Sequence, residues 1–435
     1  MTGATRQLAS CHGRYHQYFQ RHTVSIAGRA FQYLKGLFQA DKKNLERIEK
    51  RVPEVSYDPL QYFLSDADWD WRPINDQIAA DADKLLGGHG DSALYIDETG
   101  LPKKGKMSVG VSRQWCGRFS TPIDTRLYLP KNWTDDKERC KKAKIPVDEI
   151  VFKTMAEQAL EMVFHARKSE IRFNWVGFDG FYGSKPEFLR ALADNNETFM
   201  ADVHKDQHVY LEDPRPIVPV AKSKKGLKPT KLKAQTTSTR VDKLVESQPD
   251  DAWKRVKVRE TTKGKLIVDI LHKTVWLWDE KEKHARLWHL VVRREIGSPN
   301  EIKYSLSNAI SETSVKRLAY MQAQRYWVER PFQDAKNECG MGDYQARGWL
   351  AWYHHMTMVM MAMLFMIEQR LHHQVEIPLL SCADITTLLK SILPRRDVTE
   401  DEILRQLQIR HKKRQASIDH EYKKQWDSGV LRCLE

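Results

Sequence analysis

The stretch Ala93-Leu-Tyr-Ile-Asp-Glu-Thr-Gly100 decides the fold. Four largely apolar, strand-forming residues end at an acid pair, and Gly100 then allows the chain to turn. A buried strand that delivers a carboxylate at its C-terminal end is a common way to build a metal or catalytic site on a sheet. On this stretch alone, a surface turn that begins with Asp is an equally good interpretation.

The composition of the chain favours a polyanionic partner. Its 435 residues are 41% hydrophobic, which is enough for a sizeable core in roughly two to three domains. Lys and Arg number 71 against 58 Asp and Glu, giving a formal net charge of +13. Nucleic acid is the simplest partner for such a balance, and a basic solvated surface without a partner is the alternative.

Cysteine usage and hydropathy argue against a secreted or membrane protein. The longest apolar run, Met356 to Ile367, is too short to span a bilayer, and no signal peptide is evident. We therefore expect a cytoplasmic protein. No CxxC pair occurs, so neither a zinc knuckle nor a disulfide framework is indicated. The six cysteines are scattered at positions 11, 116, 140, 339, 382 and 433.

The N-terminal region, residues 1–90, has helical periodicity throughout. Lys and Arg line its first part, so we expect a small basic bundle that contacts duplex DNA. A role in packing or in protein interaction is the alternative. Gly87-Gly-His-Gly90 marks the boundary to the next domain.

Residues 91–203 predict the first part of an α/β core. Three strands, a helix, a strand, a helix and a strand follow in the order expected of an RNase H-like sheet. Asp97 ends the first strand and Asp179 ends the fourth, and these two strands are neighbours in that topology. The elements after the first strand are predicted at Met107–Trp115, Thr125–Leu129, Asp148–Arg167 (helix), Ile171–Phe178, Lys185–Asn195 (helix) and Phe199–Val203.

Residues 204–305 predict a β-rich insertion that begins with a basic loop at 222–233. Tryptophans interleaved with cations suit stacking on bases, although a Trp at strand spacing more often belongs to a core. Trp278, beside a turn, is the best candidate for exposure. The strands are expected at 255–260, 265–271, 274–279 and 285–294.

Residues 306–375 predict the second part of the core, and 376–435 a helical C-terminal region for DNA contact or dimerisation. A helix from Ser311 to Lys336 carries Glu329, and Pro331 should kink or restart it. The apolar segment Trp349–His372 predicts a core helix. Its His354-His355 pair could ligate a metal, but a capped or interface pair fits better.

Three acids lie on elements suited to phosphodiester chemistry: Asp97 and Asp179 at strand ends, and Glu329 on a late helix. Carboxylates are the hard oxygen ligands that hold a pair of Mg²⁺ ions, with Mn²⁺ as a substitute. Asp97 would bridge both ions, and the other two acids would complete one site each. Asp202 and Glu338 are the weaker rivals for the second and third positions.

The sequence resembles a DDE transposase of the IS4-like class, in the IS701 group. The resemblance extends from the N-terminal helices to about residue 370. The motifs that carry it are Ile96-Asp-Glu-Thr-Gly-Leu-Pro-Lys-Lys-Gly-Lys-Met-Ser-Val-Gly-Val-Ser-Arg-Gln-Trp-Cys-Gly117, Leu127-Tyr-Leu-Pro-Lys-Asn-Trp133, Gly177-Phe-Asp-Gly-Phe-Tyr-Gly183 and Val328-Glu-Arg-Pro-Phe-Gln-Asp-Ala-Lys-Asn-Glu-Cys-Gly340.

The resemblance implies an enzyme that binds transposon ends as a homodimer, cleaves DNA with two Mg²⁺ ions and joins the freed 3′-OH to target DNA. The Tyr-Arg-Glu-Lys signature of the class matches at Arg325, Glu329 and Lys336, but Gln322 replaces its Tyr, which Tyr320 or Tyr326 could supply. In some relatives a Trp of the insertion stacks on a flipped base, and Trp276, Trp278 and Trp288 are the candidates here. The residues expected to contact DNA are Arg325, Lys336, Tyr326, Lys103, Lys104, Arg113, Trp278, Lys224 and Lys225.

Two other functions remain open from the sequence. One is a catalytically inactive or regulatory DNA-binding protein derived from a transposase. The other is a nuclease that cuts DNA without strand transfer.

Overall fold

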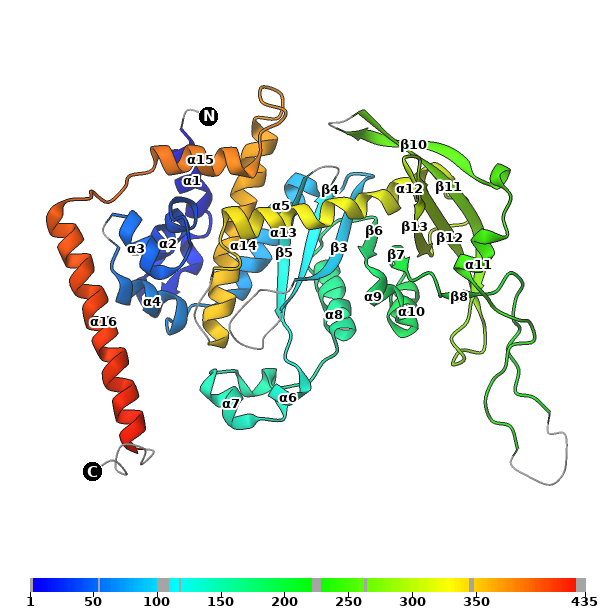
Figure 1. Cartoon of the computed structure of the whole chain (residues 1–435), viewed down its shortest axis with the longest axis horizontal. Coiled ribbons are helices and arrows are strands. Elements are labelled where there is room, and N and C mark those ends of the chain that lie inside the picture. Colours follow the sequence, from blue (N-terminus) through cyan, green and yellow to red (C-terminus); the bar gives the residue numbers. More distant parts are fainter. Residues whose placement is uncertain are drawn as a thin grey trace.

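One large mixed sheet runs through the middle of an elongated molecule (Figure 1). The computed structural model describes residues 3–53, 55–99, 109–116, 119–220, 228–261, 264–343 and 348–427. A helical bundle lies at one end of the sheet, and the strands of the insertion extend it at the other end (Figure 1). The mixed α/β class predicted from the sequence is therefore confirmed.

The N-terminal region is a helical bundle built on one buried helix from far along the chain. Helix α14 (Trp349–His372) is buried almost along its whole length and packs against the bundle on one side and the edge of the sheet on the other. Although α14 is long and apolar enough to cross a membrane, 94% of its most apolar window lies inside the protein. The bundle helices are α1 (Ala4–Gly13), α2 (Ala27–Gln39), α3 (Leu45–Arg51), α4 (Tyr57–Ser65) and α5 (Arg72–Leu86).

The two histidines of α14 are structural. His354 stacks on Trp69 with ring centroids 3.6 Å apart, and its two ring nitrogens lie 2.9 and 3.0 Å from the carbonyl oxygens of Leu64 and Trp69. The next residue, His355, shares a hydrogen bond of 2.8 Å with the hydroxyl of Tyr33. The sequence favoured a capped or interface pair, and these hydrogen bonds cap the ring nitrogens with carbonyl oxygens and a hydroxyl group.

The core of the sheet combines parallel and antiparallel pairing. Strand β3 pairs with β6 and β6 pairs with β7 in parallel, whereas β3–β4 and β4–β5 are antiparallel. The spatial order of these strands is β7-β6-β3-β4-β5. Their bounds are β3 (Ser92–Thr99), β4 (Val109–Cys116), β5 (Phe119–Leu127), β6 (Trp175–Phe178) and β7 (Phe199–Val203).

Strand β3 is buried on both faces, and its side chains alternate between two cores. Leu94 and Ile96 belong to the main core, which also contains α14 and the bundle. Ala93 and Tyr95 belong to a second core, which contains residues of α12 (Val315–Ala323) and of the insertion strands. Asp97, near the end of the strand, lines a small cavity together with Met155 and Met162.

The main helix in the connection between β5 and β6 begins later in the sequence than predicted. Helix α8 spans Met155–Lys168, whereas the sequence predicted a start at Asp148. Residues Val147–Glu149 form only a short 3₁₀ turn, and Thr154 then starts α8 through a capping box with Glu157. A capping box satisfies the first free N–H groups of a helix, so it fixes the helix start more firmly than the acids at 148 and 149 do.

The insertion continues the central sheet instead of forming a separate one. Strand β13 (Ser298–Ser307), which was not predicted, pairs antiparallel with β7 and joins the insertion to the core. The two strands predicted at 265–271 and 274–279 are one long strand, β11. The other insertion strands match the prediction within a few residues: β10 (Lys254–Thr261), β11 (Gly264–Leu277) and β12 (Arg286–Glu295).

The helix predicted at Ser311–Lys336 is divided into three parts. Helix α12 ends at Ala323, a 3₁₀ segment η4 spans Gln324–Val328, and α13 spans Glu329–Glu338. A break was therefore correctly predicted, but it precedes Pro331. That proline lies in the first turn of α13, where its missing N–H would have had no partner.

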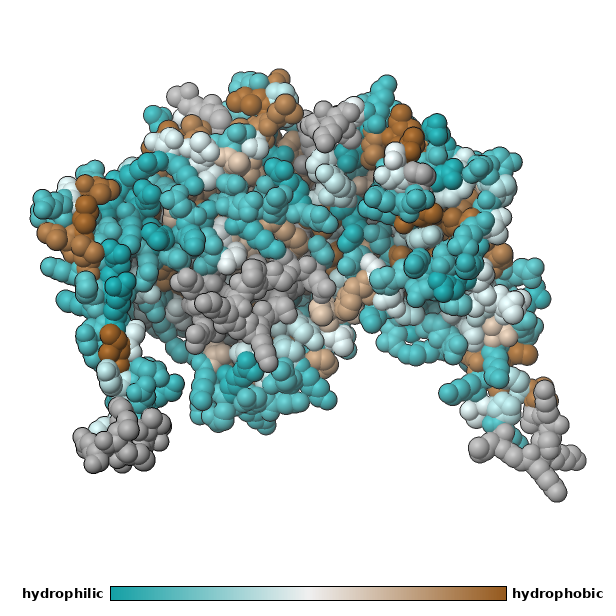
Figure 2. Space-filling model, viewed as in Figure 1, coloured by the Kyte–Doolittle hydropathy of each residue, from teal (hydrophilic) through white to brown (hydrophobic). Residues whose placement is uncertain are grey.

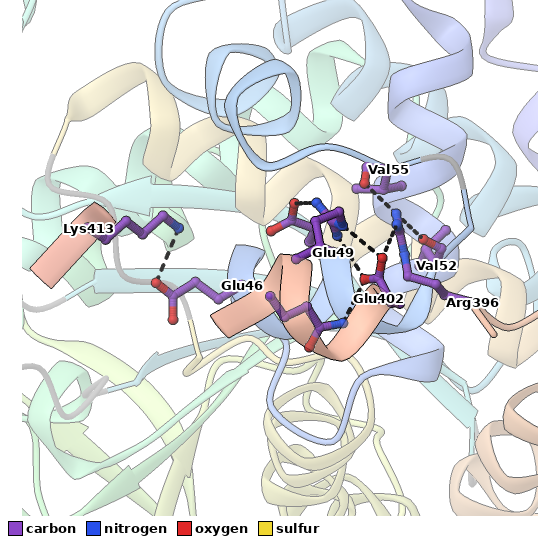
Figure 3. A network of polar contacts seen from close by, with 9 residues as sticks. Glu46, Glu49, Val52, Val55, Arg396, Glu402 and Lys413 are labelled. Atoms are coloured by element: carbon purple, nitrogen blue, oxygen red, sulfur yellow. Dashed lines mark hydrogen bonds and ion pairs between the residues drawn. The ribbon is translucent and has the colours of Figure 1, made fainter. Parts of the chain in front are cut away.

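The C-terminal region consists of two helices separated by residues 393–399: α15 (Cys382–Ile392) and α16 (Glu400–Asp427). Polar contacts hold α16 to α3, including Arg405–Glu49 at 3.5 Å and Lys413–Glu46 at 3.3 Å (Figure 3). Beyond these contacts α16 extends along one end of the molecule (Figure 1). Figure 2 shows a largely hydrophilic surface with a few hydrophobic patches. The exposed hydrophobic residues of α16 include Ile403 and Leu404.

Shorter elements complete the described chain. Among the described residues, Cys11, Cys140, Cys339 and Cys382 are buried free thiols. The short elements with stated bounds are η1 (His16–Tyr18), β1 (Gln20–Arg21), β2 (Val24–Ser25), α6 (Lys131–Thr134), α7 (Lys137–Lys142), η2 (Val147–Glu149), α9 (Gly180–Gly183), α10 (Pro186–Asp194), β8 (His208–Val209), β9 (Thr239–Arg240), α11 (Val241–Glu246) and η3 (Asp250–Ala252).

Candidate active site

Parallel pairing brings Asp97 and Asp179 to the same edge of the sheet. Tyr95 on β3 lies opposite Gly177 on β6, and each acid follows its strand residue by two positions. The two acids are therefore level with each other on adjacent strands, which lie about 4.8 Å apart. This arrangement agrees with the predicted proximity of two residues that are distant in the sequence.

Two glycines near Asp179, Gly177 and Gly183, lie where a side chain would not fit. A Cβ at Gly177 would lie 2.2 Å from the ring of Tyr95, and one at Gly183 would lie 1.9 Å from the carbonyl oxygen of Asp202. The first glycine makes room for a neighbouring aromatic ring. The second lets the short helix α9 lie directly against β7.

Asp179 has one oxygen fixed by the backbone. It caps α9, and its Oδ1 accepts hydrogen bonds from the N–H groups of Phe181 at 3.0 Å and Tyr182 at 3.4 Å. The side chain is 27% exposed, and its Oδ2 lies 3.9 Å from Nη2 of Arg325. The carboxylate therefore has a defined orientation and one oxygen that faces the side of the sheet covered by η4.

A third acid, Asp202 on β7, joins this edge. Since Phe178 on β6 lies opposite Ala201 on β7, Asp202 is level with Asp179. Its Oδ2 lies 3.4 Å from Nη1 of Arg325. Burial raises the pKa of the Asp202 carboxyl, and the positive charge of Arg325 opposes that shift.

Glu329 is delivered to the same side of the sheet by η4. This segment contacts β3, and its last residue, Val328, belongs to the second core together with Tyr95. Glu329 is the first residue of α13 and its side chain is exposed. Among the described residues, no three His, Cys, Asp or Glu side chains form a cluster that could hold a metal ion.

The other predicted DNA contacts within the described residues differ in exposure. Tyr326 is 69% exposed beside Arg259, and Lys336 lies over the ring of Phe332 on α13. Trp278 is only partly exposed, because its indole N–H donates to the carbonyl oxygen of Glu282 at 2.7 Å. Its predicted exposure is thus realised in part.

The other two candidate tryptophans of the insertion differ in burial. Trp288 is 7% exposed and packs edge-on against Phe199, so it is a core residue. Trp276 exchanges backbone hydrogen bonds with Tyr210 and is partly buried. Trp276 and Trp278 both remain candidates for contact with a base, whereas Trp288 does not.

Several predicted site residues lie outside the described part of the chain. Lys103 and Lys104, and Lys224 and Lys225, fall in residues that the structure does not describe. Arg113 lies on β4, where the backbone is described but the side chain is not. Their assignment to DNA contact stays a prediction.

Sequence reasoning missed the residues that surround Arg325. It considered Asp202 only as a rival metal ligand and noted Gln322 only as a departure from the Tyr-Arg-Glu-Lys signature. In the structure, Gln322 is buried and donates to Ser305, which in turn donates to Asp202. The i, i+3 spacing of Gln322 and Arg325 was the available signal that they share one helical face.

Comparison with known proteins decides the family. The chain matches the family described as DDE superfamily endonuclease over residues 14–121 and 117–265. These segments cover more than half of its length. This chain belongs to the DDE superfamily endonucleases. The matched part contains Asp97 and Asp179 and ends before Glu329.

A curated relative agrees with this assignment. The endonuclease is 20% identical over 338 residues to a protein described as a probable transposase for insertion sequence element IS701, from Microchaete diplosiphon. The similarity covers 73% of this chain and 76% of the relative. The resemblance noted in the sequence is thereby confirmed.

Proposed function

We propose that this endonuclease is a DNA transposase with an RNase H-like core. It binds transposon ends as a homodimer in the bacterial cytoplasm, cleaves the phosphodiester bond and transfers the freed 3′-OH to target DNA. The observation that supports the proposal is the parallel register of β3 and β6, in which Asp97 and Asp179 each follow a paired residue by two positions. The segment η4, which contacts β3, directly precedes Glu329. The strand order β7-β6-β3-β4-β5 supports the RNase H-like assignment.

The donor set fits divalent cations. Asp97, Asp179 and Glu329 offer only carboxylate oxygens, the ligands that Mg²⁺ and Mn²⁺ prefer. Asp97 would hold both ions, and the other two acids would hold one each. Two such ions supply an activated water or 3′-OH and neutralise charge on the leaving oxygen.

The protein residues have separate tasks. The backbone N–H groups of α9 hold the Asp179 carboxylate in one orientation, so less freedom is lost when it binds an ion. Arg325 supplies a positive charge beside Asp179, where the cleaved phosphate must lie. Lys336, two turns along α13 from Glu329, adds a second cation for the DNA backbone.

DNA contact outside the catalytic core is assigned to the N-terminal helices and to α16. Burial and the neighbouring Arg410 lower the pKa of Lys50, so cations of α3 and α16 lie close to each other, among the acids Glu46 and Glu49. Phosphates of a duplex would relieve that repulsion. The stretch Arg410-His-Lys-Lys-Arg414 adds further positive charge.

A two-stage assay tests the proposal. Labelled duplex that carries the ends of the element should be cleaved by the wild-type protein with Mg²⁺ and should stay intact with EDTA. Pre-cut ends should then be joined to a plasmid target. Cleavage without joining would indicate a nuclease, whereas binding without cleavage would indicate a DNA-binding protein that has lost its activity.

A further inference from the structure

A chain of polar contacts runs from α12 to the candidate catalytic edge of the sheet. Nε2 of Gln322 donates to Oγ of Ser305 at 2.9 Å and to the carbonyl oxygen of Val291 at 3.1 Å. The hydroxyl of Ser305 donates to Oδ1 of Asp202 at 2.8 Å. The other oxygen of Asp202 faces Arg325.

The direction of these hydrogen bonds is fixed. Gln322 is 3% exposed and Ser305 is fully buried, so water does not compete for their groups. A hydroxyl has a single proton to donate. Because Ser305 accepts from the amide of Gln322, its own proton goes to Asp202, and this orients the carboxylate toward Arg325.

This environment distinguishes Asp202 from a metal ligand. Both of its carboxylate oxygens already face a donor, Ser305 on one side and Arg325 on the other. Its distance to Arg325, 3.4 Å, is shorter than the 3.9 Å between Arg325 and Asp179. Asp202 is therefore the nearer anchor of the guanidinium group.

We propose that Asp202 is a positioning residue that holds Arg325 beside Asp179, so that the guanidinium group contacts a phosphate of the bound DNA. The proposal rests on the transposase function above. Guanidinium has five N–H donors, and those not directed at the two carboxylates are available for a phosphate. When Asp179 holds a divalent cation, Asp202 is the remaining negative charge that keeps Arg325 from being repelled.

Gln322 and Ser305 extend this role. Gln322 stands where the related class has Tyr, and it ties α12 to β12 and β13 through Val291 and Ser305. The residue that departs from the Tyr-Arg-Glu-Lys signature is therefore also the first residue in the chain of polar contacts to Arg325. The insertion strand β13 supplies Ser305, so the insertion helps to place a residue of the catalytic edge.

A double-mutant cycle tests the proposal: Asp202→Asn, Arg325→Ala and the two combined. Asn keeps the size of the side chain and an oxygen that accepts from Ser305, but it lacks the charge. We expect Asp202→Asn to slow cleavage about 10-fold and Arg325→Ala about 100-fold, on the scale of lost phosphate contacts. The double variant should match Arg325→Ala alone, because Asp202 acts through Arg325.

DNA binding gives an independent readout. Arg325→Ala should reduce the slope of binding affinity against salt concentration by the amount expected for about one lost phosphate contact. Asp202→Asn should also reduce this slope. In the Arg325→Ala background, Asp202→Asn should change nothing further. Thermal unfolding of each variant controls for loss of folding, and Asp206→Asn, an exposed acid shortly after β7, is the matched control.

The outcomes separate this inference from the proposed function. The positioning role would be overturned if the two substitutions had additive effects on the cleavage rate. It would also be overturned if the double variant cleaved end DNA more slowly than Arg325→Ala. If the wild-type protein binds but does not cleave end DNA, the transposase proposal fails. The binding cycle would then still decide whether Asp202 acts through Arg325.

Discussion

The variant Asp97→Asn should lose at least 10³-fold in cleavage of end DNA while it binds that DNA within about threefold of the wild type. Asp97 lies two residues before the end of β3, which runs to Thr99 and not to Asp97 as predicted, and we assign it to both metal ions. An amide lacks the charge that holds a shared pair of cations. A loss of about 4 kcal/mol of transition-state stabilisation corresponds to about 10³-fold in rate.

The measurement is single-turnover cleavage of labelled end DNA, with binding followed separately in Ca²⁺. Asp206→Asn removes one carboxylate from the exposed surface and should cleave like the wild type. If Asp97→Asn cleaved at the wild-type rate, the acid would have no part in the chemistry. If it failed to bind or to fold, the comparison would move to Asp179→Asn, for which we expect the same loss of cleavage.

The variant Gly183→Ala should lower the free energy of unfolding by about 3 kcal/mol, at the upper end of overpacking effects. An added Cβ would meet the carbonyl oxygen of Asp202 at 1.9 Å. Because that atom belongs to the backbone of β7, no side-chain rotation can relieve the contact. Either α9 or β7 must move, and Asp179 caps α9, so cleavage should fall as well.

Urea unfolding of the two proteins measures this effect, and Gly28→Ala is the control. Gly28 lies on the exposed face of α2, with nothing within 4 Å of an added Cβ. Since Ala favours a helix more than Gly does, Gly28→Ala should raise the stability by about 0.5 kcal/mol. A Gly183→Ala variant as stable as the wild type would mean that α9 does not pack against β7 as described.

The core of the sheet could be predicted from the sequence because its strands are short apolar runs that end at polar residues. The segments that become β3, β6 and β7 read this way, and their connections are long enough for parallel crossovers. Once the order is known, the proximity of Asp97 and Asp179 follows from register. The buried methionines of α14 were likewise predictable from an apolar run too long for a strand.

Other elements were harder to predict, for identifiable reasons. Strand β13 begins with Ser298-Pro-Asn300, which is typical of a turn, and this turn signal hides the alternation of Ile302, Tyr304 and Leu306 that follows. The start of α8 depended on Thr154, whose capping box outweighs the earlier acids. In both cases the sequence carries the correct local pattern, but a neighbouring turn sequence or acid pair suggests a different strand or helix boundary.

The partners of Arg325 could not be predicted from the sequence at all. Asp202 and Ser305 come to it from β7 and β13, and that pairing exists only after the insertion strands have joined the sheet. The contact of Trp278 with Glu282 is similar, because it depends on the shape of one turn. Side-chain exposure and ion pairing depend on the tertiary structure, whereas strand ends and helix caps depend on a few neighbouring residues in the sequence.

Metal binding in the DNA complex tests the central claim most directly. The endonuclease should be crystallised with pre-cut end DNA and Mn²⁺, and anomalous scattering used to locate the ions. The account predicts two Mn²⁺ ions in contact with Asp97, one of them also bound by Asp179 and the other by Glu329. A DNA complex in which Mn²⁺ is absent from this edge, or in which Glu329 lies away from the other two acids, would contradict it.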